Sequence, residues 1–320
     1  MPQALHDSHA IFVLPSAHDP AAIGKGNRRW LSRGKLSIAT DLVDPMAELL
    51  RLINIDLPES GQAALRIWGQ TGERPSDWIA AADPVNLEAR LTHVVLHKID
   101  AGDLPSEELA VLVDLLQRTL GDGGPVGFVR IREHVYLRSK VALASASRSA
   151  DYVDGQAPDA LMPSGDDSAS HHRLLSEIQM SLHDHETNKR RERRGLLPVN
   201  SLWIWGGGYA PEPTLQPLPP LYSDDPFLCG LWRSRLAVTS SWSEDFDEMF
   251  EASMSGFVAV APASGAVSSY VSRLRELHAV RKPGRLTLLF RDGLRVELRA
   301  RDRYRFWRGI SRNFPGTGNE

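Results

Sequence analysis

Carboxylates and histidines, the side chains that most often carry acid–base or metal chemistry, gather between residues 171 and 185. Glu177 and Asp184 lie seven residues apart, a spacing that places both on one face of a helix. Two carboxylates on one face could act as general acid and base or hold a metal ion. The alternative is a solvated face on which Arg173 pairs with Glu177 at the i,i+4 spacing. We favour the solvated face.

The same stretch contains four histidines: His171, His172, His183 and His185. A helix presents two histidines to one metal ion when they are four residues apart. His183 and His185 are two residues apart and point to different faces. The sequence therefore predicts no metal ion here. His183, Asp184, Glu177 and Asp83 remain secondary candidates for ligand binding.

A basic run follows, with five cationic residues between Lys189 and Arg194. Such runs are usually solvated, and at the C-terminal end of a helix they complement its dipole. The functional alternative is an anion site, in which Asn188 and Arg191 reach a phosphate group.

A strand with two tryptophans comes next and ends in three glycines. Asn200 stands at its start, where the side-chain amide could tie down a loop or contact a ligand. Gly206, Gly207 and Gly208 permit positive φ and close approach of a ligand to the backbone. No helix follows, so the phosphate-binding order of strand, Gly-rich loop and helix is not met. These four residues join Asn188 and Arg191 as the main ligand-binding candidates.

The hydrophobic pattern predicts strands that alternate with helices around these residues. The expected strands are 11–14, 93–99, 201–205 and 256–261, with a strand pair over 127–141. The expected helices are 41–53, 61–68, 105–120, one beginning near 171, 245–253, 264–280 and 303–314. Ser106 is expected to cap the third helix. A turn is expected at Asp83-Pro84 because the residue before proline avoids helical geometry.

This order predicts an α/β fold: a mostly parallel sheet with helices on both faces, plus an antiparallel C-terminal hairpin around Asp292-Gly293. We expect a single domain over residues 1–320. Within it, a flexible loop or internal linker is expected near 145–170, and a Pro-rich excursion without helix or central strand over 211–226.

Composition excludes several classes of protein. Lys and Arg total 37 against 40 Asp and Glu, and a net charge of −3 argues against a nucleic-acid partner for the whole chain. The single cysteine, Cys229, excludes a disulfide framework. The sequence shows no signal peptide and no apolar run of membrane length, so we expect a cytoplasmic protein without membrane contact.

The C-terminal region is basic, with ten arginines between residues 281 and 312. Around the hairpin they alternate with apolar residues, so one sheet face should carry a row of guanidinium groups, here called the arginine face. It could bind nucleic acid, an acidic partner protein or the acidic remainder of the same chain. We favour the internal partner, because long arginine stems also cover apolar surface.

The segment from Glu177 to Gly208 resembles known proteins. It looks like the archaeal-type cofactor-independent phosphoglycerate mutases, which carry a His-Pro-x-Asn-x-x-Arg run and later a strand that ends in Trp-Gly-x-Gly. It is closer to the RpfE-type regulatory proteins, bacterial relatives with the signature EIQMxLHxHxxN…PVNSLWxWGGG. Trp78 and the segment 82–85 also fit that pattern. The resemblance implies the parallel-sheet α/β core of the alkaline-phosphatase superfamily.

The chain departs from the mutase pattern at the metal site. The first strand of the mutases leads to a metal-binding aspartate, whereas residues 11–16 read IFVLPS. Residues 256–266, GFVAVAPASGA, also lack the expected Asp and His ligands, and Glu186 replaces a proline. The sequence thus predicts a regulatory or ligand-binding protein that lacks the catalytic metal site, needs no cofactor and senses a phosphorylated small molecule.

Two alternatives remain. The chain could be an active phosphoglycerate mutase or phosphohydrolase that uses Mn or Mg with rearranged ligands drawn from Asp83, His183 and Asp184. It could also be an interaction module that binds a protein partner through the arginine face.

Overall fold

The structure is a computed structural model that describes residues 8–17, 23–38, 45–100, 102–165, 168–281 and 283–305. Contacts divide the chain into two compact units. Unit 1 comprises residues 1–57, 213–225 and 232–320, and unit 2 comprises 58–212 and 226–231. Whether the two units fold as the single expected domain stays a prediction. In the described ranges, no helix is long and apolar enough to cross a membrane.

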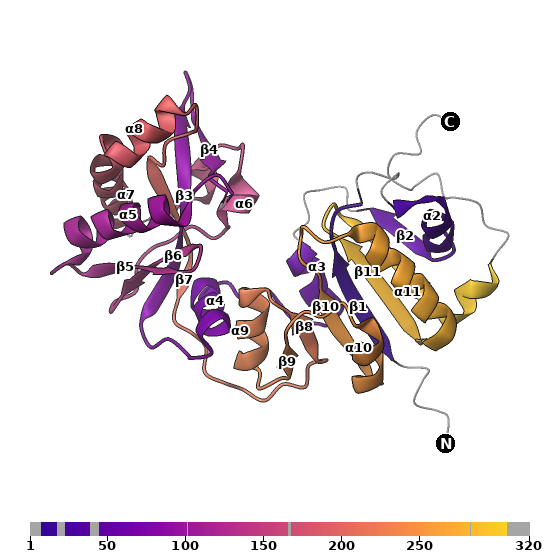
Figure 1. The fold of residues 1–320 in the computed structure, drawn as a ribbon. Coiled ribbons are helices and arrows are strands. Elements are labelled where there is room, and N and C mark those ends of the chain that lie inside the picture. Colours follow the sequence, from indigo (N-terminus) through magenta and orange to yellow (C-terminus); the bar gives the residue numbers. More distant parts are fainter. Residues whose placement is uncertain are drawn as a thin grey trace. The chain divides into compact units, whose positions relative to one another are not determined.

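Unit 1 is built on a seven-stranded sheet in the order β2-β12-β11-β1-β10-β8-β9 (Figure 1). Its strands are β1 (His9–Leu14), β2 (Lys35–Ile38), β8 (Leu221–Ser223), β9 (Thr239–Ser240), β10 (Gly256–Val260), β11 (Arg285–Phe290) and β12 (Leu294–Arg299). β1, β8, β9, β10 and β11 run parallel, and β12 is antiparallel to both β11 and β2. The predicted mostly parallel sheet and C-terminal hairpin are therefore confirmed.

Helices lie on both faces of this sheet, as expected. They are α2 (Lys25–Leu31), α3 (Pro45–Leu52), α10 (Phe246–Ala252) and α11 (Val267–Arg281), with a short 3₁₀ turn, η3 (Ala300–Tyr304). Phe12 and Leu288 pack with Leu274 of α11 on one face, along which Figure 1 shows α10 and α11. Side chains alternate along a strand, so Arg295 points to the other face, where it lies 2.7 Å from Glu48 of α3.

Unit 2 has a second sheet, antiparallel, in the order β4-β3-β6-β5, with β7 also paired to β3. Its strands are β3 (Trp78–Ala89), β4 (Val94–Lys98), β5 (Val126–Ile131), β6 (His134–Ser139) and β7 (Ser201–Gly208). Its helices are α4 (Gln62–Thr71), α5 (Ser106–Leu116), the π-helical η1 (Gln117–Gly121), α6 (Ala150–Val153), the 3₁₀ turn η2 (Asp159–Leu161), α7 (Ser168–His183) and α8 (Glu186–Arg193); α9 (Pro226–Ser234) begins in this unit. Ile178 of α7 and Ile204 of β7 belong to its main apolar core.

β3 has two successive partners along one edge. β6 pairs with Trp78–Ala81 and β4 pairs with Val85–Ala89, so residues 82–84 pair with neither strand. β7 pairs with the opposite edge of β3. We call this interruption the sheet gap. The predicted turn at Asp83-Pro84 is wrong, because the extended geometry required before proline is also that of a strand.

Other local predictions also need correction. Pro105, not Ser106, is the N-cap of α5. The basic run does lie at the C-terminal end of a helix, but this helix is α8, which is separate from α7 and has His185 as N-cap and Arg194 as C-cap. Residues 221–223 form β8 inside the sheet, although prolines surround them. Of the helix expected at 303–314, the structure describes only η3, and the remainder lies outside the described residues.

Candidate functional site

A cavity of about 400 Å³ opens at the sheet gap in unit 2. Asp83 and Pro84 line it from β3, Lys98 from the end of β4, and His134 from the start of β6. Arg66 reaches it from α4. Since antiparallel pairing places the end of β4 and the start of β6 beside the gap, the fold brings together residues far apart in the sequence.

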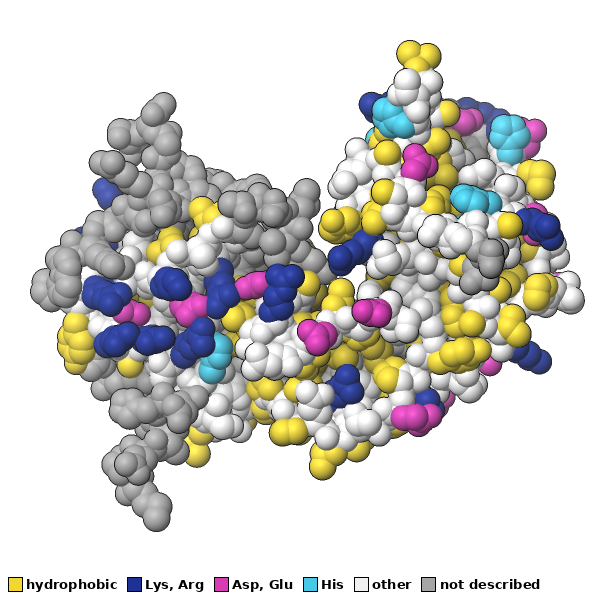
Figure 2. Space-filling model, turned by 180° about the vertical axis from the view of Figure 1, so that it is seen from behind, with side chains coloured by type: hydrophobic (Ala, Val, Ile, Leu, Met, Phe, Trp, Pro, Cys, Tyr) yellow, Lys and Arg dark blue, Asp and Glu magenta, His cyan; other side chains and the backbone are white. Residues whose placement is uncertain are grey.

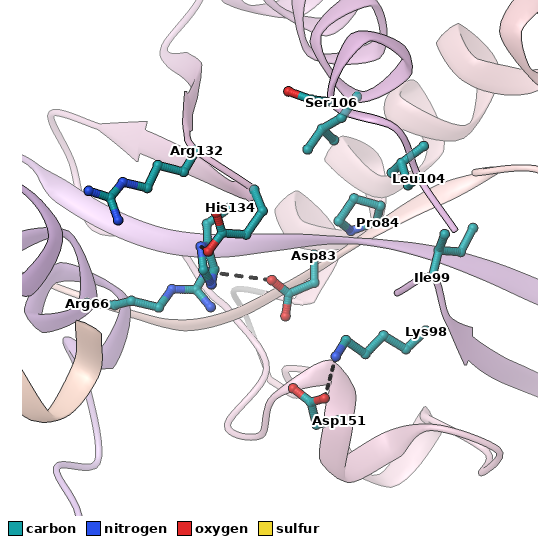
Figure 3. Close-up of a pocket in the computed structure, with 12 residues that line it drawn as sticks. Arg66, Asp83, Pro84, Lys98, Ile99, Leu104, Ser106, Arg132, His134 and Asp151 are labelled. Atoms are coloured by element: carbon teal, nitrogen blue, oxygen red, sulfur yellow. Dashed lines mark hydrogen bonds and ion pairs between the residues drawn. The ribbon is translucent and has the colours of Figure 1, made fainter. Parts of the chain in front are cut away.

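Arg66 and Asp83 form the most buried charged pair of this pocket, and their side chains are 12% and 14% exposed. Arg66 Nη2 lies 3.6 Å from Asp83 Oδ1, and Figure 3 shows the two side chains pointing toward each other. The indole Nε1 of Trp205 donates to Asp83 Oδ2 at 2.5 Å. The guanidinium carbon of Arg66 lies 4.8 Å from the ring centre of Tyr136 and 5.5 Å from that of Trp205, within cation–π range.

Arg66 Nη2 is buried and has no hydrogen-bond partner in the part of the chain that the structure describes. A buried donor without a partner is costly. Protein atoms cover this nitrogen, so an anion could contact only the exposed remainder of the Arg66 side chain, which lines the cavity.

A chain of hydrogen bonds holds Arg66 in place. Arg66 Nε donates to the Tyr136 hydroxyl at 2.9 Å, which in turn donates to Gln70 Oε1 at 2.7 Å. The amide nitrogen of Gln70 lies 3.0 Å from His134 Nδ1. Burial raises the pKa of Tyr136 to about 12. Burial, and then the charge of Arg66, lower the pKa of His134, which favours the neutral imidazole.

Lys98 stands on the other side of the pocket. It donates to Asp151, and its Nζ lies 3.3 Å from Asp100 Oδ1. Burial opposes its charge, but the hydrogen bond and carboxylate of Asp151, with Asp100, hold the pKa of Lys98 above its usual value. Figure 3 shows Asp83, Lys98 and Asp151 directed toward the same space.

The tight turn between β5 and β6 contributes Arg132 and Glu133 to the pocket. Arg132 has a positive φ of 56°, a conformation that costs a non-glycine residue about 1 kcal/mol or more. Glu133 Oε1 lies 3.2 Å from His134 Nδ1. The pocket thus combines cations and carboxylates with an apolar wall formed by Pro84, Ile99, Leu104 and Leu109. Its cations could hold an anionic group, and its carboxylates could accept hydrogen bonds from hydroxyl groups.

Asn188 and Arg191, two of the predicted ligand contacts, bind the protein itself. Asn188 donates to the backbone oxygens of Leu182 and Val199 at 2.9 and 2.8 Å. Arg191 is 1% exposed, donates to the Leu197 oxygen, and pairs with Glu108 at 2.9 Å. Both side chains therefore fasten α8 to its neighbours, and a role in ligand binding stays a prediction.

Asn200 and the three glycines also make internal contacts. The Asn200 side chain exchanges two hydrogen bonds with the backbone of Leu87, at 2.7 and 3.0 Å. A Cβ on Gly207 would lie 2.2 Å from Trp78, and one on Gly208 would lie 2.3 Å from the nitrogen of Gly61. The glycines of β7 thus allow close packing of protein against protein, and their contact with a ligand is untested.

The secondary candidates are distributed differently. Asp83 lies in the pocket, whereas Glu177 lies half-buried on α7, and His183 and Asp184 lie exposed at or just after its end. Asp184 is 3.6 Å from Lys189. Across the described ranges, no three His, Cys, Asp or Glu side chains are grouped so that they could hold a metal ion. Asp83, His183 and Asp184 therefore do not assemble into a metal centre.

In unit 1, the hairpin turn occupies part of the edge where α/β sheets usually bind ligands, the carboxyl ends of the parallel strands. The nitrogen of Ala17, just after β1, donates to Asp292 Oδ2 at 2.7 Å. Arg291 donates to the oxygen of Ala261, just after β10, at 3.1 Å. The ends of β1 and β10 at this edge are thus bound by side chains of the hairpin turn.

The arginine face forms internal ion pairs, as favoured from the sequence. Arg285 lies 2.8 Å from Glu297, and Arg295 contacts both Glu297 and Glu48. Figure 2 shows, on its left, dark-blue cationic side chains gathered around magenta acidic ones. The role of this face as an interaction module stays a prediction.

Sequence reasoning missed Arg66, Lys98 and His134 as pocket residues. Each lies in a segment whose hydrophobic pattern predicts a helix or a strand but gives no sign of a ligand-binding site. The one available signal was Asp83 beside Pro84 in an otherwise apolar strand, because a carboxylate in such a position needs a partner.

Comparisons with known proteins support a relation to the mutases. The chain is 27% identical over 137 residues to a 2,3-bisphosphoglycerate-independent phosphoglycerate mutase of Methanosarcina mazei, covering 41% of this chain and 34% of that protein. It is 26% identical over 133 residues to a probable mutase of the same kind from Geobacter sulfurreducens, covering 40% and 32%. The chain thus matches about a third of the length of these curated relatives. No family model matches it.

Solved structures give weaker likenesses. The cofactor-independent phosphoglycerate mutase of Thermoplasma acidophilum is 18% identical with a TM-score of 0.44, covering 91% of this chain and 90% of that one. The PH0037 protein of Pyrococcus horikoshii is 14% identical with a TM-score of 0.49, covering 89% and 82%.

Proposed function

We propose that this chain is a phosphoglycerate-mutase-like regulatory or ligand-binding protein of the RpfE type, located in the cytoplasm. It binds a phosphorylated small molecule in the unit 2 pocket and performs no metal-dependent catalysis. Partial similarity to the mutases supports the choice of a phosphorylated ligand, since the names of those relatives identify enzymes of phosphoglycerate.

The observation that carries the proposal is the guanidinium of Arg66, which lines the cavity and makes no direct hydrogen bond to Asp83, 3.6 Å away. Tyr136 holds this guanidinium, and Lys98 and Arg132 line the same cavity. A guanidinium fixed in this way can donate a charge-assisted hydrogen bond to a phosphate oxygen. Ligand binding should cost little conformational entropy at Arg66, because this side chain is already held in position.

Isothermal titration calorimetry of the full chain with inorganic phosphate and with 3-phosphoglycerate, both in EDTA, tests the proposal. We expect binding of both anions by the unchanged protein and its loss in Arg66→Gln. Arg173→Gln, which removes an exposed cation of α7 outside the pocket, is the matched control and should bind normally. Failure of the unchanged protein to bind phosphate would refute the proposed site.

A second measurement separates the proposal from the enzymatic alternative. The chain is mixed with 3-phosphoglycerate and Mn²⁺, and the formation of 2-phosphoglycerate is followed. We expect none. Turnover that a chelator abolishes would overturn the regulatory assignment and favour a metal-dependent mutase.

A further inference from the structure

The unit 2 pocket contains equal numbers of permanently positive side chains and carboxylates. Its lining contains three permanent cations, Arg66, Lys98 and Arg132, and three carboxylates, Asp83, Glu133 and Asp151. The fourth basic group, His134, has a lowered pKa and is therefore mainly neutral at neutral pH. A pocket adapted to a ligand with two or more acidic groups would be expected to carry an excess of cations.

Two of these carboxylates also have an oxygen that could accept a further hydrogen bond. Asp151 binds Lys98 through Oδ1, and Glu133 approaches His134 through Oε1. Among the described residues, the second oxygen of each carboxylate has no hydrogen bond. Both side chains are more than half exposed, at 69% and 54%, so these oxygens can accept from a ligand that brings hydroxyl donors.

The remaining wall is apolar. Pro84, Ile99, Leu104 and Leu109 contribute aliphatic surface to the cavity of about 400 Å³. Pockets of this size accommodate molecules well beyond a three-carbon acid. Aliphatic walls of this kind contact the carbon skeleton of a ligand, whereas its polar groups meet the charged rim.

We propose that the ligand is a phosphorylated sugar or polyol, with one phosphate group and several hydroxyl groups but no carboxylate. The inference rests on the proposed function and narrows its ligand class. The phosphate binds the guanidinium of Arg66 where it lines the cavity, and the hydroxyl groups donate to Asp151 and Glu133. A carboxylate on the ligand would instead meet like charges at these positions, and such contacts are unfavourable.

Calorimetric titration of the full chain with four probes tests this ligand class: inorganic phosphate, glycerol 3-phosphate, glucose 6-phosphate and 3-phosphoglycerate. We expect glucose 6-phosphate to bind at least about tenfold more tightly than 3-phosphoglycerate, the effect of one unfavourable charge contact. Glycerol 3-phosphate, which has the carbon number of 3-phosphoglycerate but no carboxylate, should also bind more tightly than that acid.

A variant that lacks one carboxylate of the pocket provides a second test of the ligand class. Asp151→Asn changes an exposed side chain, so the protein should still fold. The variant should bind 3-phosphoglycerate more tightly, which narrows or reverses the preference for glucose 6-phosphate over 3-phosphoglycerate. Glu192→Gln removes an exposed carboxylate of α8 outside the pocket and should leave the preference unchanged.

The outcomes distinguish the two proposals. If 3-phosphoglycerate binds as tightly as glucose 6-phosphate and glycerol 3-phosphate, the sugar or polyol inference is wrong but the phosphate site stands. An unchanged preference in Asp151→Asn also counts against the inference. If none of the four probes binds, the proposed function fails and the inference fails with it.

Discussion

Arg66 Nη2 and Asp83 Oδ1 face each other at 3.6 Å, beyond hydrogen-bond distance, although both side chains are almost buried. Trp205 satisfies the other oxygen of Asp83, and Tyr136 holds the Nε of Arg66. Other residues therefore hold both side chains in place, and no direct hydrogen bond joins Arg66 to Asp83. An anion at the exposed part of the Arg66 side chain would not have to break a direct hydrogen bond between Arg66 and Asp83.

Replacing Arg66 by lysine should weaken the binding of inorganic phosphate by about tenfold, because lysine keeps the charge but loses the planar fork and the contact with Tyr136. Titration calorimetry of Arg66→Lys beside the unchanged protein measures this. Equal affinities would show that charge alone, and not the held geometry, determines binding.

The positive φ of Arg132 leads to a second prediction. Arg132→Gly should leave the free energy of unfolding unchanged or raise it by up to about 1 kcal/mol, since glycine adopts this conformation without strain. Phosphate affinity should fall several-fold, because a pocket cation is lost. Urea denaturation and calorimetry on the same sample check both parts. A less stable protein with full affinity would contradict the role given to this turn.

Arg191 should act on stability and not on ligand binding. Its guanidinium is buried against Glu108 and backbone oxygens, so Arg191→Met should lower the free energy of unfolding by about 3 kcal/mol. Arg193→Met, at an exposed position of the same helix, should cost less than about 0.5 kcal/mol. Phosphate affinity, measured where both variants are folded, should not change. Selective loss of affinity in Arg191→Met would restore it as a ligand contact.

The crossing of α4 and α9 depends on two glycines. A Cβ on Gly230 would lie 1.8 Å from the oxygen of Leu65, and one on Gly69 would lie 1.8 Å from the oxygen of Pro226. Either alanine substitution should lower the free energy of unfolding by at least about 2 kcal/mol. Gly102→Ala, with no described atom within 4 Å of the new Cβ, is the control and should change it little. Thermal unfolding of the three variants measures this. If Gly69→Ala and Gly230→Ala unfold at the same temperature as Gly102→Ala, the close contact between α4 and α9 is wrong.

His9 should make stability depend on pH. Burial, and then the charge of Arg285, lower its pKa from 6.5 to about 4 in the folded protein, with smaller effects of Glu297 and Arg295. Between these values the unfolded chain binds the proton more readily. The stabilisation by neutral His9 is thus complete above pH 6.5 and is lost as the pH falls toward 4.

His9→Gln should reduce this pH dependence, because glutamine does not titrate and can still approach the hydroxyl of Thr287, which lies 2.9 Å from His9 Nε2. Free energies of unfolding at pH 7 and pH 5, for both proteins, check this. An equal loss of stability in the two proteins would exclude His9 as the source.

Local patterns identified much of the fold. The apolar run 11–14 and the Asp-Gly turn at 292–293 each report structure within a few residues, and both were predicted correctly. The strand through Pro84 was missed because its course depends on pairing with β7, a partner more than a hundred residues away. α2 and β2 were missed as well, in a segment without clear periodicity.

The candidate site was predicted less well, for a related reason. Asn188 and Arg191 stand out in the sequence because polar residues were expected to face solvent or a ligand, yet both satisfy buried backbone groups. Arg66 and Lys98 do not stand out at all. The antiparallel pairing of β4 with β3 places Lys98 beside Asp83, and the packing of α4 on the sheet places Arg66 there. Local spacing in the sequence reports neither arrangement.

The charged residues of the pocket, from Arg66 to Asp151, all belong to one uninterrupted stretch of unit 2, whereas the sheet edge bound by Asp292 belongs to unit 1. The corresponding coding regions are therefore separate. Mutations that accumulate in the region for residues 58–212 leave the region for this edge untouched, and recombination can exchange residues 58–212 as one piece, whereas unit 1 is encoded in three separate pieces. In a gene arranged in this way, one continuous region can change the lining of the cavity while the sheet edge bound by Asp292 stays as it is.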